Sequence, residues 1–285
     1  MVPEAPQNVA NARLRRKLGS RPWALEVFDH SLKKRLKLDL LLRMAGDLDG
    51  RSCLLVTCGD NPGALNWHFR AAGGTWNWAE MEADRIPAMQ GLLDEILHHA
   101  SPEELPFEDE TFDLVVLIDV HEHLDQVAAL NREIRRVLVP GGQAIVTTPS
   151  GDTRLPLARL KRGLGMTPEI YGHKVQGYTL EELESMMREV FLVPDGRGAY
   201  SRFFTEGIEL ALNFAYVKVL GRSPDGGDPP EGEIAPSSAD KLENVGGAWK
   251  LYRRVFPLLS GISRLDGLLP GSGGYAVAVS ARKPL

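Results

Sequence analysis

The sequence predicts an α/β fold in which a largely parallel sheet is covered by helices. Short apolar segments that suit buried strands alternate with segments of helical periodicity along most of the chain. Several of the apolar segments end in a glycine-rich or acidic turn, as strands do where a parallel sheet meets a ligand. Together these two patterns predict repeated strand–helix–strand units, interrupted once before the last apolar segment.

The first part of the chain supplies most of these units. A polar lead, residues 1–19, precedes a helix expected over Pro22–Ala45, which Asp29 or Ser31 divides. We then expect strands at 52–58, 75–80, 97–100, 112–118 and 143–148, and helices at 62–72, 84–96 and 125–138. The last of these helices stops before Pro140-Gly141-Gly142, a sequence that does not continue a helix.

The second part adds helices and two strands. A helix is expected over 155–164, and Thr179 and Glu182 have the spacing of a capping box, which predicts a helix to about Arg188. A further strand is expected to begin at residues 190–193, and the last strand is expected over 274–282.

An insertion separates those two strands. It contains a helix at 203–220 and an apolar segment at 249–269, which Pro257 and Gly261 are expected to break into two short helices. We therefore divide the chain into a helical lead (1–48), a core (49–200), a helical insertion (201–270) with a flexible linker (221–245), and a closing strand (271–285).

Composition excludes several classes of protein. Of 285 residues, 43% are hydrophobic and 25% charged, with a net charge of −5, which opposes bulk nucleic-acid binding. Cys53 and Cys58 lie on one predicted strand and cannot pair, so we expect a reducing cytoplasm. We find no apolar signal core in the first residues and no run long enough to span a membrane.

Three features stand at the expected carboxyl ends of strands. The first strand runs into Gly59-Asp60-Asn61-Pro62-Gly63, where glycines allow close backbone approach and the following helix N-terminus attracts an anion. Glu80 ends the second, 80 − 63 = 17 residues after Gly63. Asp119 ends the strand at 112–118, where open α/β sheets bind ligands.

These features, with the segment LPFEDETFDLVVLIDVHEHL that contains Asp119 and the Pro-Gly-Gly break that follows it, resemble the class I S-adenosylmethionine (SAM) methyltransferases, in particular their type 11-like domains. The resemblance is firm over residues 50–150. It implies a Rossmann-like doubly wound sheet of about seven strands with the last strand antiparallel. Thr57 and Asn61 depart from the family pattern, which has an acidic residue and a glycine at these positions.

The resemblance also implies the cofactor site. The turn would wrap the methionine part of SAM, and Glu80 would accept hydrogen bonds from the ribose hydroxyls. The family's acidic residue near the adenine corresponds to Ser101, and we expect its neighbours Pro102 and Glu103 to contact the cofactor. The cofactor-binding candidates are Gly59, Asp60, Asn61, Gly63, Glu80, Pro102, Glu103 and Asp119.

Three histidines are candidate catalytic bases. His121 and His123 follow the Asp119 strand, and His173 lies in a loop that covers the acceptor site in the resembled fold, together with Tyr171 and Tyr178. For His123, support of local structure is the alternative. A metal site is not expected, because His121 and His123 lack an evident third ligand.

The sequence therefore predicts a SAM-dependent methyltransferase acting on a hydrophobic or lipid-linked acceptor. The insertion is expected to serve as a packed lid, a dimer contact or a peripheral membrane surface, the last with Trp249, Tyr252 and Phe256 at the interface and Lys250, Arg253 and Arg254 facing anionic lipid. The alternatives are a small-molecule tailoring methyltransferase, a non-catalytic SAM-binding protein, and a nicotinamide dehydrogenase, which the missing G-x-G-x-x-G pattern disfavours.

Overall fold

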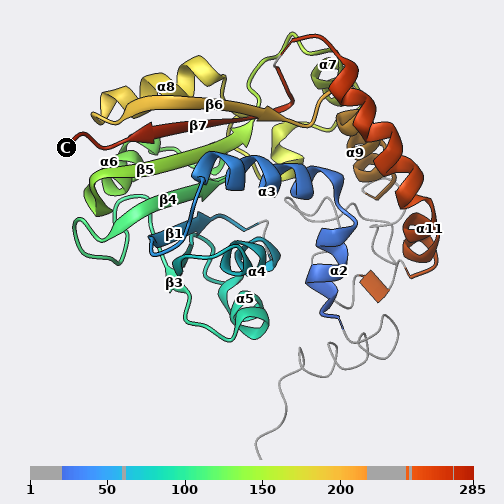
Figure 1. Cartoon of the computed structure of the whole chain (residues 1–285). Coiled ribbons are helices and arrows are strands. Elements are labelled where there is room, and N and C mark those ends of the chain that lie inside the picture. Colours follow the sequence, from blue (N-terminus) through green and yellow to red (C-terminus); the bar gives the residue numbers. More distant parts are fainter. Residues whose placement is uncertain (1–20, 60–61, 217–241, 244–245, 272) are drawn as a thin grey trace, which may run out of the picture.

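The structure is a computed structural model that describes residues 21–59, 62–216, 242–243, 246–271 and 273–285. A seven-stranded sheet with the order β3-β2-β1-β4-β5-β7-β6 forms its centre (Figure 1). The strands are β1 (Ser52–Thr57), β2 (Thr75–Glu80), β3 (His98–His99), β4 (Phe112–Ile118), β5 (Leu138–Pro149), β6 (Val193–Tyr200) and β7 (Ala276–Arg282). β1 to β5 are parallel, whereas β7 is antiparallel to both neighbours, β5 and β6, so the predicted sheet is confirmed.

Helices cover both faces because alternate strand residues point to opposite sides. The α-helices are α2 (Trp23–Asp29), α3 (Leu32–Ala45), α4 (Ala64–Ala71), α5 (Ile86–Leu93), α6 (Val127–Val137), α7 (Pro156–Gly163), α8 (Leu180–Glu189), α9 (Phe203–Ala215) and α11 (Gly246–Ser263). Leu55 of β1 packs with α2 to α5, whereas Leu54 and Val56 pack with α6 and α8. Two hydrophobic cores therefore sandwich the sheet.

Local sequence explains several helix boundaries. Ser31 accepts a hydrogen bond from the Lys34 backbone N–H and begins α3, so the predicted division at Ser31 is confirmed. Thr179 and Glu182 form the predicted capping box of α8. The chain turns directly from α6 into β5 at Leu138, so β5 begins before the Pro-Gly-Gly sequence and not after it as predicted.

The predicted break at Pro257 and Gly261 is wrong, because α11 continues to Ser263 and a 3-10 turn, η4 (Arg264–Leu268), follows it. A proline has no N–H to donate to the carbonyl four residues earlier in the helix. Because Pro257 lies on the exposed side of α11, water can bond to that carbonyl instead. The polar lead and most of the predicted linker 221–245 lie outside the described residues.

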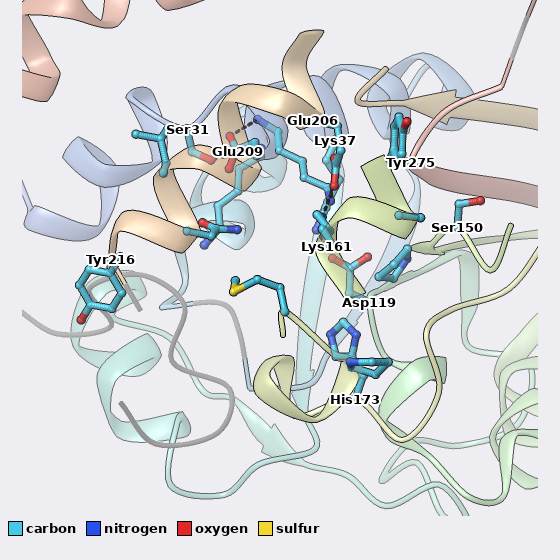
Figure 2. Close-up of a pocket in the computed structure, with 18 of the residues that line it drawn as sticks. Ser31, Lys37, Asp119, Ser150, Lys161, His173, Glu206, Glu209, Tyr216 and Tyr275 are labelled. Carbon is cyan, nitrogen blue, oxygen red and sulfur yellow. Dashed lines mark hydrogen bonds and ion pairs between the residues drawn. The ribbon is translucent and has the colours of Figure 1, made fainter. Parts of the chain in front are cut away.

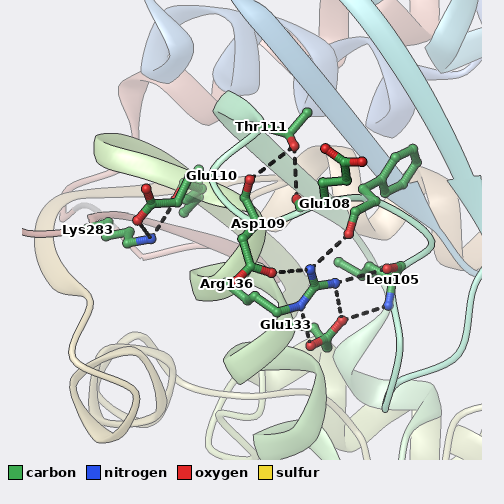
Figure 3. Close-up of polar contacts among 10 residues, drawn as sticks. Leu105, Glu108, Asp109, Glu110, Thr111, Glu133, Arg136 and Lys283 are labelled. Atoms are coloured by element: carbon green, nitrogen blue, oxygen red, sulfur yellow. Dashed lines mark hydrogen bonds and ion pairs between the residues drawn. The ribbon is translucent and has the colours of Figure 1, made fainter.

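Arg136 on α6 anchors the acidic loop that leads into β4 (Figure 3). Its guanidinium donates to the carbonyls of Leu105 (3.0 Å) and Phe107 (2.8 Å) and pairs with Asp109 (2.7 Å). Glu133 accepts from both Arg136 (2.6 Å) and the Leu105 backbone N–H (2.8 Å). The network fixes the loop before β4 and hence the start of that strand.

Candidate active site

A cavity of about 330 Å³ lies at the carboxyl ends of β4 and β5, and residues of α7, α9 and α11 line it (Figure 2). Its volume is in the range of small-molecule sites. Apolar side chains on its wall include Val27, Ala158, Met166, Leu212, Trp249 and Tyr252. Charged side chains on its wall are Lys33, Lys34, Lys37, Lys161, Arg162, Asp119, Glu206 and Glu209. The cavity therefore suits a ligand with an apolar body and a few polar groups.

A buried ion cluster forms the wall between α3, α7 and α9. Glu206 is 1% exposed, lies 3.4 Å from the Lys33 ammonium and pairs with Lys161. Ser201 donates a further hydrogen bond to it (2.6 Å). Burial by itself raises the pKa of the Glu206 carboxyl, but the two lysines and these hydrogen bonds lower it to about 2. Glu206 is therefore ionised at neutral pH and joins three helices.

Asp119 lies on the cavity wall at the end of β4, where the sequence places it. Its backbone has a positive φ of 50°, and its N–H donates to the Thr147 carbonyl (3.0 Å). Lys37 forms an ion pair with its Oδ2. Its Oδ1 is buried and has no hydrogen-bond partner in the described part of the chain. That oxygen can accept from a ligand in the cavity.

His123 and His173 both line the cavity. Their rings meet edge to face with centroids 4.7 Å apart, although 50 residues separate them in sequence (173 − 123). The Nδ1 of His123 lies 3.0 Å from the Gly172 carbonyl. This bond supports the loop, so His123 has the structural contact that the sequence left open as its alternative role.

His121, a candidate catalytic base from the sequence, does not line the cavity. Its side chain is 0% exposed and its Nε2 lies 2.8 Å from Asn131 Oδ1 on α6. Burial lowers its pKa to about 4, and the hydrogen bond to Asn131 only partly opposes this. Both histidines lie in the 3-10 turn η1 (His121–His123), but His121 is buried against α6 whereas His123 lines the cavity.

The turn after β1 is joined to the end of β2 through Glu80. Glu80 Oε1 accepts from the backbone N–H groups of Gly59 (2.8 Å) and Glu82 (2.9 Å), and Oε2 accepts from the Thr57 hydroxyl (2.6 Å). Burial raises the pKa of Glu80, and these hydrogen bonds offset the rise only in part. Thr57, which stands where the family has an acid, therefore braces Glu80.

Glycine is required at both ends of this turn. Gly59 has φ 75° and Gly63, which caps α4, has φ 86°, values that other residues rarely adopt. A Cβ at Gly59 would lie 2.5 Å from Glu82 Oε2. Asp60 and Asn61 lie outside the described residues.

Glu82 is a candidate that sequence reasoning missed. Its carboxylate lies over Gly59, at the point where a ligand would approach the backbone, and it also pairs with Arg85 (3.2 Å). A ligand at the turn must displace this carboxylate or bond to it. The available signal was the position of Glu82 just two residues beyond the strand-end acid.

Pro102 and Glu103 lie in a tight turn closed by reciprocal backbone bonds between Ser101 and Glu104 (3.2 Å each). Glu103 is exposed and borders a second, shallow hollow beside Arg136. This hollow is lined by a different part of the chain from the cavity at Asp119. The adenine-side role of these two residues stays a prediction.

The described residues fit SAM at this edge of the sheet. Gly59 lacks the side chain that would block approach to the turn. Glu80 Oε2 receives one donor, which leaves capacity for a ribose hydroxyl. Because β1 lies between β2 and β4, a ligand across these strand ends reaches Asp119, whose Oδ1 suits an ammonium group.

Comparisons with known proteins agree with this geometry. The model of the methyltransferase domain family matches residues 77–146. The chain is 30% identical over 117 residues to a ubiquinone biosynthesis O-methyltransferase of Alkalilimnicola ehrlichii, covering 40% of this chain and 47% of the relative. It is 30% identical over 125 residues to a malonyl-[acyl-carrier protein] O-methyltransferase of Erwinia billingiae, covering 44% and 49%. The chain thus spans about half the length of these relatives.

A solved SAM-dependent methyltransferase of Thermotoga maritima shares the fold across nearly the whole chain. The TM-score is 0.53 at 14% identity, with 95% of this chain and 99% of that one covered. The family match falls on β2 to β5, the strands whose carboxyl ends carry Glu80 and Asp119. With its strand order and its glycine turn, the chain has the fold of the class I SAM-dependent methyltransferases, and residues 77–146 match the methyltransferase domain family.

Proposed function

We propose that this protein transfers the methyl group of SAM to an acceptor held in the cavity that residues of α7, α9 and α11 line. The observation that carries the proposal is the alignment of the Gly59 turn, Glu80 and Asp119 along neighbouring strand ends, with the cavity beginning at Asp119. SAM supplies an activated methyl group. The protein has to hold an acceptor in line with it and exclude water, which the enclosing helices support.

The lining favours an amphipathic acceptor. Lys33 and Lys161 pair with Glu206, and Lys37 pairs with Asp119, so much of the charge on the wall is internally balanced. The remaining wall is mainly apolar and aromatic. A hydrophobic or lipid-linked acceptor, such as a quinone or lipid precursor, is therefore our preferred class. A small soluble acceptor is the competing proposal, and profiling of both classes with radiolabelled SAM separates them.

Glu80→Ala is expected to weaken SAM binding by about 1.5–3 kcal/mol, the usual contribution of hydrogen bonds to a charged partner. The loss has two sources. The ribose loses a hydrogen-bond acceptor, and the Gly59 N–H loses the hydrogen bond to Glu80 that holds the turn in place. Titration calorimetry on both proteins measures it. Glu108→Ala, at an exposed carboxylate before β4, is the control and should bind as wild type. Equal affinities for wild type and Glu80→Ala would reject this site.

The outer face of α11 supports a second proposal, peripheral contact with an anionic membrane. Trp249, Tyr252 and Phe256 were expected at the lipid interface, but they face inward. The ring centroids of Trp249 and Phe256 lie 5.5 and 5.0 Å from that of His30, Tyr252 donates to the His30 carbonyl, and Phe256 is buried. The structure thus contradicts the predicted aromatic rim.

Exposed leucines and cations of α11 and η4, and not the aromatic side chains, form the surface that we propose contacts the membrane. Leu251, Leu258 and Leu268 are 62, 66 and 80% exposed, and Lys250 and Arg254 are exposed among them. Arg253 instead pairs with Glu26 (3.0 Å). Exposed leucines next to cations are typical of helices that lie on a membrane surface. No helix among the described residues is long and apolar enough to cross a membrane.

Reversal of Arg254 to glutamate is expected to weaken binding to anionic liposomes at least about fivefold, since each cation near the surface contributes about 1 kcal/mol. Leu258→Glu should weaken it further, and high salt should weaken the binding of the wild type. Sedimentation with anionic and neutral liposomes gives the measurement. Arg43→Glu makes the same charge change on α3 and is the control. If Arg254→Glu and Arg43→Glu behave alike, α11 is a lid or a contact with a second copy.

A further inference from the structure

We propose that Glu122, His123 and His173 form a binding site for a divalent transition-metal ion, with Zn²⁺ as the reference ion, on the wall of the acceptor cavity. One ligand atom from each residue lies within 4.8 Å of the other two. Glu122 and His123 come from η1 after β4, and His173 comes from the loop after η2 (Pro168–Tyr171). Figure 2 shows His173 beneath Asp119, at the cavity. The distant loop thus supplies His173, and the set contains Glu122 in place of His121, the residue that the sequence analysis considered beside His123.

The donor set is one that transition metals prefer. Two imidazoles and one carboxylate bind Zn²⁺ at sites that keep positions open for a substrate. His123 also has the outer contact that such ligands need. Its Nδ1 lies 3.0 Å from the Gly172 carbonyl, so an N–H there leaves Nε2 with its lone pair available for a metal. A cation at this place also stabilises the Glu122 carboxylate, which is 0% exposed.

The two segments are held together independently of any ion. The backbone N–H of Lys174 donates to the Glu122 carbonyl (2.8 Å), and that of Val175 donates to the same oxygen (3.3 Å). The Lys174 ammonium also pairs with Asp125. These bonds bring His173 beside His123. Two ligand atoms, each about 2.1 Å from a tetrahedral ion, lie about 3.4 Å apart. The ligand atoms here lie within 4.8 Å of one another, so they have to approach by at most about 1.4 Å.

The chemical role of this site rests on the proposed methyl transfer. His123 and His173 both line the cavity, so an ion held by them would lie beside an acceptor bound there. A metal there would bind an acceptor hydroxyl and lower its pKa. The hydroxyl proton passes to solvent, the oxygen forms a bond to the methyl carbon, the carbon–sulfur bond breaks, and neutral S-adenosylhomocysteine leaves. The site thus assigns a hydroxyl, rather than a nitrogen or carbon, as the acceptor group.

Metal titration of the full chain tests the site without knowledge of the acceptor. After chelator treatment and dialysis, the wild type is expected to bind one Zn²⁺ per chain by calorimetry and by elemental analysis. Co²⁺ at the same site should give visible absorption. His173→Ala and Glu122→Gln should each lower Zn²⁺ affinity at least about 100-fold, more than the loss of an outer contact of a metal ligand. His99→Ala, at an exposed histidine on β3, is the control and should bind as wild type.

SAM titration of the same variants separates the two proposals. His173→Ala should bind SAM as the wild type does, which shows that it is folded and that its loss concerns the metal. If the wild type binds no Zn²⁺ after chelation, or if His173→Ala and His99→Ala bind it equally, the metal site is rejected while the SAM site stands. If the wild-type protein does not bind SAM, the proposed function is rejected, whereas the result of the Zn²⁺ titration still stands.

Discussion

Gly59→Val is expected to abolish SAM binding while the protein stays folded. Gly59 has φ 75°, and a Cβ there would meet the Glu82 carboxylate at 2.5 Å. A β-branched side chain is strained at this φ and fills the space through which a ligand would approach the turn. Calorimetry with SAM, together with circular dichroism, measures binding and fold in the same samples.

Gly50→Val is the matched control for this variant. Gly50 has a similar φ of 70°, and nothing lies within 4 Å of where its Cβ would be. Both variants should lose about 1–3 kcal/mol of stability from backbone strain. Only Gly59→Val should lose SAM. A folded Gly59→Val protein that binds SAM with unchanged affinity would show that the cofactor lies elsewhere.

Glu206→Gln is expected to lower the free energy of unfolding by about 3 kcal/mol, because it leaves two partly buried ammonium groups, of Lys33 and Lys161, without their main countercharge. Chemical denaturation at neutral pH gives the value. Asp39→Asn is the control, because its ion pair with Arg43 is exposed on both sides and should contribute less than about 1 kcal/mol. Equal stabilities of the two variants would contradict the assignment of Glu206 as the centre of the cluster.

The pH dependence of the same pair of proteins gives a second check. The pKa of Glu206 is lowered from 4.5 to about 2, so the folded state holds fewer protons than the unfolded state between these values. The contribution of ionised Glu206 to the free energy of unfolding is complete above about pH 4.5 and is lost as the pH falls towards 2. The stability difference between wild type and Glu206→Gln should therefore shrink over this interval. A difference that stays constant down to pH 2 would mean that Glu206 is not ionised in the folded protein.

The strands of the sheet could be predicted because the residue pattern that identifies each strand lies within a few consecutive residues. The runs at 52–58, 75–80 and 112–118 have the apolar character of buried strands, and each ends in residues that stop a strand. Parallel strands place their carboxyl ends at one edge of the sheet, which is why Asp119 could be assigned to a ligand crevice before its neighbours were known. The capping box at Thr179 was likewise contained in four consecutive residues.

The sequence could not predict which face of the insertion helix α11 packs against the rest of the protein. Helix α11 has aromatic residues on one side, such as Trp249 and Phe256, and aliphatic residues on another, such as Leu251 and Leu258. With apolar residues on both sides, periodicity does not identify the face that packs. The aromatic side turns inward, where Trp249 and Phe256 contact His30 and Phe256 also contacts Arg35.

The sequence by itself determined the order of strands and helices, the glycine turn and the acidic strand ends, because these depend on residues close together in the chain. Tertiary structure alone decided which distant residues meet. It joined Glu206 to Lys33 and Lys161, placed His173 beside His123, and buried His121 against α6. Such contacts depend on how whole helices and loops pack on the sheet, and packing geometry leaves no periodic mark in the segments that it brings together.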